Sequence, residues 1–229
     1  MRQFLTIGLT LLCFPVSTLA GSLQGTAIYS GKLQTPKPFS TGKYKKACGE
    51  HVPNDSLILD GKGLKNVVVT IEGDKLKGKS APVTINQKDC RYEPHVVVIN
   101  KDSELKITSE DPINHNIHTY SFDNDPINIM LTPQQNEYIH ELEEPEIIKV
   151  ECDLHAWMSA WVVVAPNGFH AVTEDKGAYK IPNLPSGKYT ITAWHETLGN
   201  ISKKITVSDA SQTIDFDFSH LTPQESEHD

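Results

Sequence analysis

The heptapeptide 152–158, CDLHAWM, carries three side chains that could bind a metal. Cys152, His155 and Met158 offer a thiolate, an imidazole and a thioether within one short segment. These soft and borderline donors suit copper that cycles between Cu(I) and Cu(II), and they do not suit calcium or magnesium. A copper site of this kind needs a second imidazole. The upstream run 114–118, NHNIH, contains two candidates, His115 and His118.

The elements around the heptapeptide are predicted to be β-strands. Runs of apolar and β-branched residues at 146–151 and 161–165 flank it, so the donors lie on a loop between two strands. Periodicity is strand-like along the whole chain, with no convincing amphipathic helix. The segments 32–53, 75–81 and 123–136 are expected to be irregular. Further strands are predicted at 25–29, 57–59, 67–71, 95–100, 104–108 and 137–141.

The pattern of apolar residues and turn sequences changes after residue 165. Short alternating apolar runs are bounded by the turn sequences DKG (175–177) and PSG (185–187), which indicates short antiparallel strands. This part resembles the carboxypeptidase regulatory-like (transthyretin-like) β-sandwich module. It is short for that family, and the strand at 25–29 is a candidate to complete it.

The donor pattern resembles a known family. Cys-x2-His-x2-Met before a valine strand, with an upstream His-Asn-aliphatic-His, is similar to amicyanin among the type 1 copper proteins, the cupredoxins. Plastocyanin has a related arrangement with a longer gap between the loop histidine and the methionine. The resemblance covers about residues 111–165. It implies an all-β chain, with a cupredoxin-like Greek-key β-sandwich followed by a small Ig-like or transthyretin-like sandwich.

The resemblance also assigns roles to individual residues. It places His115, Cys152 and His155 in a trigonal plane around one type 1 copper, with Met158 as the weak axial ligand. It gives Asn116 a supporting role, in which its backbone N–H donates to the cysteine sulfur. It makes His155 the solvent-facing ligand. Electrons then leave through an apolar patch at Ala156 and Trp157.

His118 stays open as an extra ligand, although positions 115 and 118 of a strand point to opposite faces. Zinc is the rival metal, but zinc sites rarely recruit a thioether. A c-type haem is excluded at this loop because Cys-x-x-Cys-His is missing.

The N-terminus predicts export. An apolar run at 4–14 follows Arg2 and small residues end at Ala20, which indicates a signal peptide over 1–20 and a periplasmic protein. No later segment is long and apolar enough to span a membrane. Loss of the signal removes Cys13 and leaves three cysteines. Because the metal hypothesis keeps Cys152 as a free thiolate, Cys48 and Cys90 are predicted to form a disulfide.

Residues 21–165 are assigned to the copper domain with an N-terminal extension, 166–220 to the second module and 221–229 to a flexible tail. The formal charge of −8 argues against nucleic acid and favours docking to basic partners.

The leading functional prediction is a one-electron carrier without enzymatic activity. Its partners would be redox proteins such as a c-type cytochrome or a periplasmic dehydrogenase. The first alternative is copper sequestration or delivery, although Met-rich tracts are missing, since only three methionines occur. The second is a β-sandwich binding or adhesion module with incidental copper. A multicopper oxidase is disfavoured because the sequence has no His-x-His pair.

Overall fold

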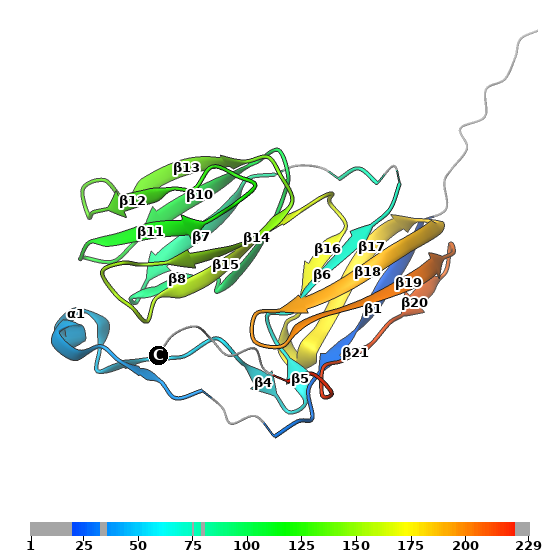
Figure 1. Cartoon of the computed structure of the whole chain (residues 1–229), viewed down its shortest axis with the longest axis horizontal. Coiled ribbons are helices and arrows are strands. Elements are labelled where there is room, and N and C mark those ends of the chain that lie inside the picture. The colour runs from blue at the N-terminus through cyan, green and yellow to red at the C-terminus, as the bar shows by residue number, and fades with distance from the viewer. Residues whose placement is uncertain (1–19, 33–35, 75, 79–80, 223–229) are drawn as a thin grey trace, which may run out of the picture.

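The chain is seen in a computed structural model that describes residues 20–32, 36–74, 76–78 and 81–222 (Figure 1). Within these ranges the secondary structure is almost entirely β, and the one α-helix, α1 (Lys45–Cys48), has four residues. The prediction of an all-β protein is therefore confirmed. The predicted signal peptide lies outside the described residues except for Ala20, and so does the predicted tail beyond residue 222. In the described part of the chain, no helix is long and apolar enough to cross a membrane.

The first sandwich consists of two sheets built from residues 83–165 (Figure 1). In β10, every second side chain is buried, as expected for a strand with one face on an apolar core. One sheet has the order β13 (Glu137–Leu142), β10 (Ser103–Ser109), β7 (Val83–Lys88) and β8 (Arg91–Glu93). The other has the order β12 (Asn128–Leu131), β11 (His115–Tyr120), β14 (Glu146–Glu151), β15 (Ser159–Ala165) and β9 (Val96–Asn100).

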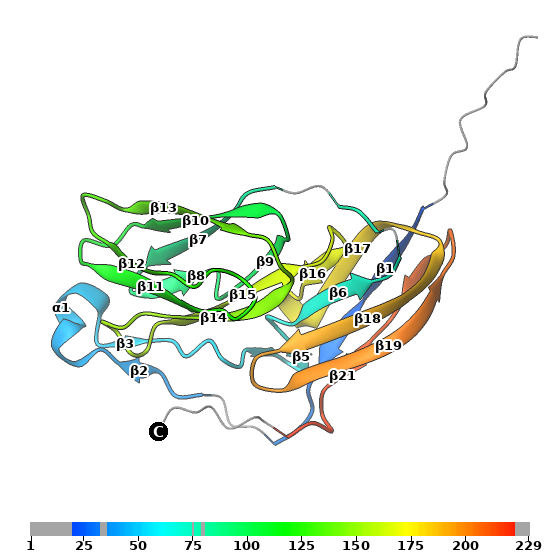
Figure 2. The ribbon, with the colours of Figure 1, turned by 45° about the horizontal axis from the view of Figure 1, so that its top comes forward.

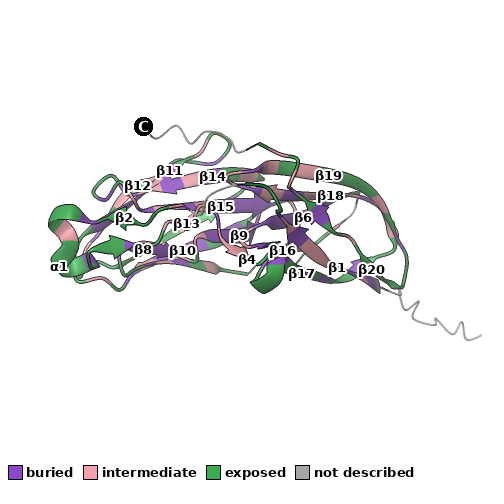
Figure 3. Cartoon of the chain, turned by 90° about the horizontal axis from the view of Figure 1, so that it is seen from below, coloured by how far each residue is buried: buried purple, intermediate pink, exposed green. Residues whose placement is uncertain are grey.

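The second sandwich takes strands from both ends of the described chain. One sheet contains β17 (Ala178–Pro185), β1 (Ala20–Ile28), β5 (Gly63–Leu64) and β4 (Leu59–Asp60), with β20 (Ser211–Thr213) and β21 (Phe216–Asp217) also paired to β1. The other contains β16 (His170–Val172), β6 (Val68–Glu72), β18 (Gly187–His195) and β19 (Gly199–Val207). Each sandwich has its own core cluster of buried residues, and Figure 3 colours the buried stretches of the strands purple.

The division of the chain differs from the boundary drawn at residue 165. Strands β4, β5 and β6 belong to the second sandwich and not to an extension of the first. Strand β1, which contains most of the segment named as a candidate to complete the second module, pairs with β17 of that sandwich. The physical reason is that a short apolar run identifies a strand without identifying the sheet that receives it. Residues 123–136, expected to be irregular, also contain β12, which pairs with β11 as an edge strand between Pro126 and Pro133.

An excursion links the two sandwiches near the N-terminus. It comprises β2 (Phe39–Ser40), the 3-10 turn η1 (Gly42–Tyr44), α1 and β3 (His51–Val52). Strands β2 and β3 pair with each other, and the buried Cys48 and Val52 pack into the core of the first sandwich. Figure 2 shows the excursion lying along the end of the first sandwich near β11 and β14.

A separate apolar cluster joins the two sandwiches. Its buried members are Val68, Val96, Val98, Val163 and Ala165. The indole rings of Trp161 and Trp194 pack edge-on beside it, with centroids 5.2 Å apart. Only four residues separate β15 from β16, so the joint is a packed contact with a short connection.

Candidate metal centre

The loop at 152–158 is held in shape by its own main chain. Cys152 N donates to Met158 O at 3.1 Å, His155 N to Cys152 O at 3.2 Å, and Met158 N to His155 O at 2.8 Å. The loop closes the hairpin between β14 and β15, which pair from Glu146↔Val164 to Glu151↔Ser159. Two paired strands therefore fix both ends of the segment that carries three predicted ligands.

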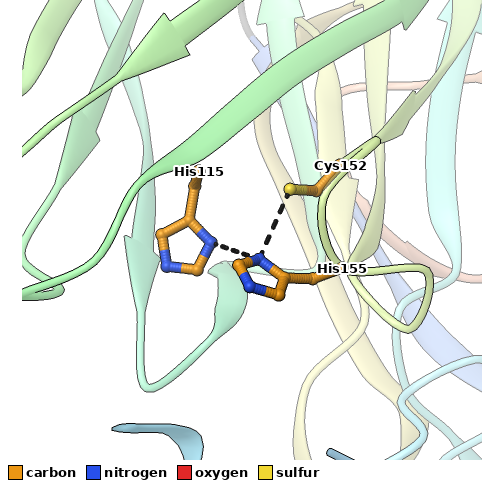
Figure 4. A group of neighbouring side chains, drawn as sticks. All are labelled: His115, Cys152 and His155. Carbon is orange, nitrogen blue, oxygen red and sulfur yellow. Dashed lines mark hydrogen bonds between the residues drawn. The ribbon is translucent and has the colours of Figure 1, made fainter. Parts of the chain in front are cut away.

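Three of the predicted donors converge on one point (Figure 4). His155 Nδ1 lies 3.0 Å from His115 Nδ1 and 3.7 Å from Cys152 Sγ. His115 comes from β11, whose neighbour β14 delivers Cys152. Donor atoms bound to one metal at about 2.0–2.3 Å lie roughly 3–4 Å from each other. The spacing of the three atoms therefore fits a shared metal ion.

All three donors are withdrawn from solvent. The exposed fractions of His115, Cys152 and His155 are 0%, 2% and 1%. Met158, the predicted axial ligand, is also buried and belongs to the same core cluster as Cys152. Cys152 is free, and Cys48 and Cys90 are joined in a disulfide, which is the arrangement predicted from the odd cysteine count.

The electrostatics of the cluster favour a thiolate. Burial raises the pKa of Cys152, but hydrogen bonds from His115 and from the backbone N–H groups of Asn116, Leu154 and His155 outweigh burial, so the pKa is lowered. Burial lowers the pKa of His115, but Asp111 and Cys152 outweigh it, so the pKa is raised. Burial, and then the nearby charge of His115, lower the pKa of His155 to about 4. These shifts favour the thiolate form of Cys152, the protonated form of His115 and the neutral form of His155, and an incoming cation would displace the protons from the donor atoms.

Asp111 is a functional residue that the sequence analysis missed. Its Oδ2 accepts hydrogen bonds from His115 Nε2 at 2.9 Å and from Cys90 N at 2.8 Å, while Oδ1 accepts from Asp89 N at 2.8 Å. With Nε2 engaged, Nδ1 of His115 is the nitrogen left for a metal. The sequence feature that could have indicated this role is the position of Asp111, a carboxylate four residues before His115.

Cys90 lies close enough to Asp111 and His115 to form a second possible metal-binding group with them. Its sulfur is in the disulfide with Cys48, so it is not available as a ligand.

Asn116 ties the ligand loop to β11. Its Oδ1 accepts from Asp153 N at 2.8 Å, and its Nδ2 donates to Asp153 Oδ2 at 3.0 Å and to Asn128 Oδ1 at 2.8 Å. Its backbone N–H also contributes to the lowered pKa of Cys152. The role that the resemblance gives to the Asn116 N–H, as a donor to the sulfur of a bound thiolate, stays a prediction. Tyr92, another residue not foreseen, donates its buried O–H to Asn116 O at 2.6 Å and to Glu151 O at 3.0 Å.

His118 points away from the three donors. Its Nδ1 lies 3.1 Å from Asp153 Oδ1, and its ring stacks on Tyr120 with centroids 4.5 Å apart. The side chain is 32% exposed, unlike His115 on the same strand. It is not one of the three residues whose donor atoms converge.

The solvent-facing role expected of His155 is wrong. The ring is covered by Tyr44, which meets it edge-on at 4.3 Å between centroids, and by Trp157 at 5.1 Å. Tyr44 belongs to the excursion, which comes from the other sandwich, so a local reading of the loop could not foresee it. Within the predicted exit patch, Ala156 is exposed, while Trp157 is half-buried and donates from Nε1 to Cys90 O at 3.1 Å.

No protein-family model matches the chain, and no curated protein matches it. Solved structures resemble parts of it. A copper-containing nitrite reductase from Thermus scotoductus SA-01 aligns at 18% identity and a TM-score of 0.34, over 37% of this chain and only 22% of that chain. A purple cupredoxin from Nitrosopumilus maritimus aligns at 22% identity and a TM-score of 0.31, over 35% of this chain and 97% of that chain. The reduced Cu(I) form of an amicyanin variant aligns at 16% identity and a TM-score of 0.34, over 42% of this chain and 97% of that chain.

Proposed function

We propose that this protein is a periplasmic one-electron carrier that holds a single copper ion. The ligands are His115, Cys152 and His155, with Met158 in the axial position. The observation that carries the proposal is the convergence of one cysteine sulfur and two imidazole nitrogens in one buried cluster. One thiolate, two imidazoles and a weak thioether form the ligand set of electron-transfer copper sites. Copper bound there would supply the Cu(II)/Cu(I) couple.

The residues around the cluster suit a site that changes little between oxidation states. The hairpin loop is closed by three main-chain hydrogen bonds, and Asn116 ties it to β11. Asp111 holds the His115 ring through Nε2, and the backbone N–H groups that stabilise the Cys152 thiolate moderate its donor strength. Ligands that are already positioned need little rearrangement when one electron arrives or leaves.

Burial favours electron transfer over the other functions. A delivery protein must hand over its metal, yet each of the three converging donors is at most 2% exposed. The same cover leaves a substrate no direct approach to the cluster, which supports a non-enzyme. An adhesion module should present exposed aromatic residues on the second sandwich. Among the described residues, the exposed large hydrophobic side chains all lie in the first sandwich or the excursion.

The compartment is proposed from two features. The N-terminal sequence has the form of a signal peptide. The disulfide between Cys48 and Cys90 suits an oxidising environment such as the periplasm.

The test measures redox cycling and metal retention on the same sample. Protein loaded with Cu(II) is cycled by protein-film voltammetry and then incubated with a Cu(I) chelator in excess. We expect one copper per chain, a reversible one-electron wave and copper loss that takes hours. Transfer of the copper to the chelator within seconds, with no reversible wave, would contradict electron transfer and favour delivery.

A further inference from the structure

The excursion brings positive charge to the metal centre of an acidic protein. Residues 36–53 contain four lysines and one glutamate, a formal charge of +3, whereas the whole chain carries −8 and the remainder therefore −11. The lysines Lys37, Lys43, Lys45 and Lys46 are exposed. None of them forms a salt bridge among the residues that the structure describes. The basic turn, defined as residues 42–46, is therefore free to meet an anionic surface.

The basic turn is anchored to the first sandwich. Cys48, at the end of α1, is bonded to Cys90. Thr41, just before the turn, is buried and its N–H donates to Glu50 O at 3.2 Å. The lysines are thus presented at a fixed place and do not sit on a free arm.

Tyr44 connects the basic turn to the cluster of donors. Its ring centroid lies 4.3 Å from that of His155 and 5.9 Å from that of Trp157. Lys43 Nζ lies over the Tyr44 ring, 5.0 Å from its centroid. Tyr44 is half-buried while His155 is 1% exposed. An electron that reaches the surface of the turn therefore has a short route through one aromatic ring to a ligand.

We propose that the basic turn is the docking surface for an acidic redox protein, and that Tyr44 carries the electron between that partner and His155. This inference rests on the proposed function. The step moves one electron: the reduced partner loses it and Cu(II) becomes Cu(I), with no bond made or broken and no proton transferred. It also reverses the expectation from net charge, which pointed to basic partners, because local charge at the contact governs docking.

The first experiment measures docking without copper. Amide shifts of the copper-free protein are followed by NMR during titration with an octaglutamate peptide. We expect shifts confined to the basic turn and its neighbours. They should vanish in Lys43→Glu/Lys45→Glu/Lys46→Glu and persist in the control Lys180→Glu/Lys188→Glu/Lys204→Glu, which makes the same charge change at exposed lysines of the second sandwich. Equal loss in both triple variants, or capture of the turn by phosphatidylglycerol vesicles but not by the peptide, would overturn the inference.

The second experiment measures the rate of reduction of the Cu(II) protein by hexacyanoferrate(II), an anionic one-electron donor. We expect the rate to fall as salt is added, despite the negative net charge, and to be at least about tenfold lower in the basic-turn variant than in the control variant. A rate that rises with salt, or is equal in the two variants, overturns the docking surface while leaving the copper site intact. A protein that takes up no electron at all overturns the proposed function instead.

The third experiment tests whether Tyr44 carries the electron, by measuring partner docking and electron transfer separately in Tyr44 variants. Tyr44→Leu should keep the peptide-induced shifts but lower the limiting rate of reduction, and Tyr44→Phe should restore that rate because it keeps the ring. If Tyr44→Leu reduces as fast as the unaltered protein at saturating donor, the route does not pass through Tyr44.

Discussion

The two sandwiches treat their buried polar side chains differently. In the second, Thr173 donates to Leu64 O and accepts from Val67 N, and Asn167 donates to Ile71 O, so these groups serve the fold by pairing with the main chain. In the first, Nδ1 of His155 faces Nδ1 of His115 and the sulfur of Cys152, and hydrogen bonds lower the pKa of the Cys152 thiol. Similar sheets therefore provide a framework in both halves, but among the described residues it is the first sandwich that brings imidazole and thiol donors together at one point.

The largest expected effect is a loss of stability that leaves the metal centre unchanged. Ile71, in β6, is fully buried in the core of the second sandwich. Ile71→Ala should lower the free energy of unfolding by about 2–5 kcal/mol, because it removes buried methyl groups and leaves a cavity. Urea denaturation of the copper-free protein measures the loss. The visible spectrum of the copper-loaded variant should match that of the unaltered protein, and a changed spectrum would show that the two halves are not independent in this respect.

The next effect concerns His195, a buried histidine of the second sandwich that is not a predicted metal ligand. Burial, and then the charge of nearby His95, lower the pKa of His195 to about 4. Because the unfolded side chain binds a proton near pH 6.5, the stability that neutral His195 supports is present above that pH and is lost as pH falls toward 4. The loss should be about 3 kcal/mol over this window.

This pH dependence is isolated with His195→Leu. Free energies of unfolding of the copper-free unaltered and variant proteins are compared between pH 4 and pH 7. Their difference should vary with pH in the sense just given, since all other titrating groups are common to both. Parallel curves would contradict a perturbed His195.

A smaller effect is expected at the carboxylate behind the first histidine. Asp111→Asn keeps the shape of the side chain but removes the charge that holds His115 Nε2. Copper affinity, measured by competition with a chelator, should fall about 10–100-fold. The neighbouring Glu110→Gln is the matched control, because Glu110 pairs with Lys88 and Asn86 and not with a ligand. Equal affinities in the two variants would remove Asp111 from the site.

The smallest effect is expected at His118. Its partner Asp153 also accepts from Asn116 and Asn128, so His118→Ala should leave the loop in place. Copper affinity should change by less than about twofold, in line with an ordinary surface substitution. A tenfold loss would make His118 a ligand and would require a different arrangement of the centre.

Much of the site could be predicted because its donors are local in sequence. Cys152, His155 and Met158 share one loop, and an odd cysteine count left two residues to pair. Tyr44 and Asp111 could not be assigned so easily, since the first reaches the cluster from the excursion and the second acts through His115. Alternation of apolar residues also indicated most strands. It could not assign β4, β5 and β6 to the second sandwich, because pairing partners far apart in the chain leave no local pattern.

The measurement that tests the central claim most directly is the visible and electron paramagnetic resonance spectrum of the Cu(II)-loaded protein beside Cys152→Ala. We predict an intense thiolate-to-copper charge-transfer band with a narrow copper hyperfine splitting, bleached reversibly by a mild reductant and lost in the variant. A weak spectrum of square-planar type that is the same in both proteins would contradict the claim that Cys152, His115 and His155 form an electron-transfer copper site.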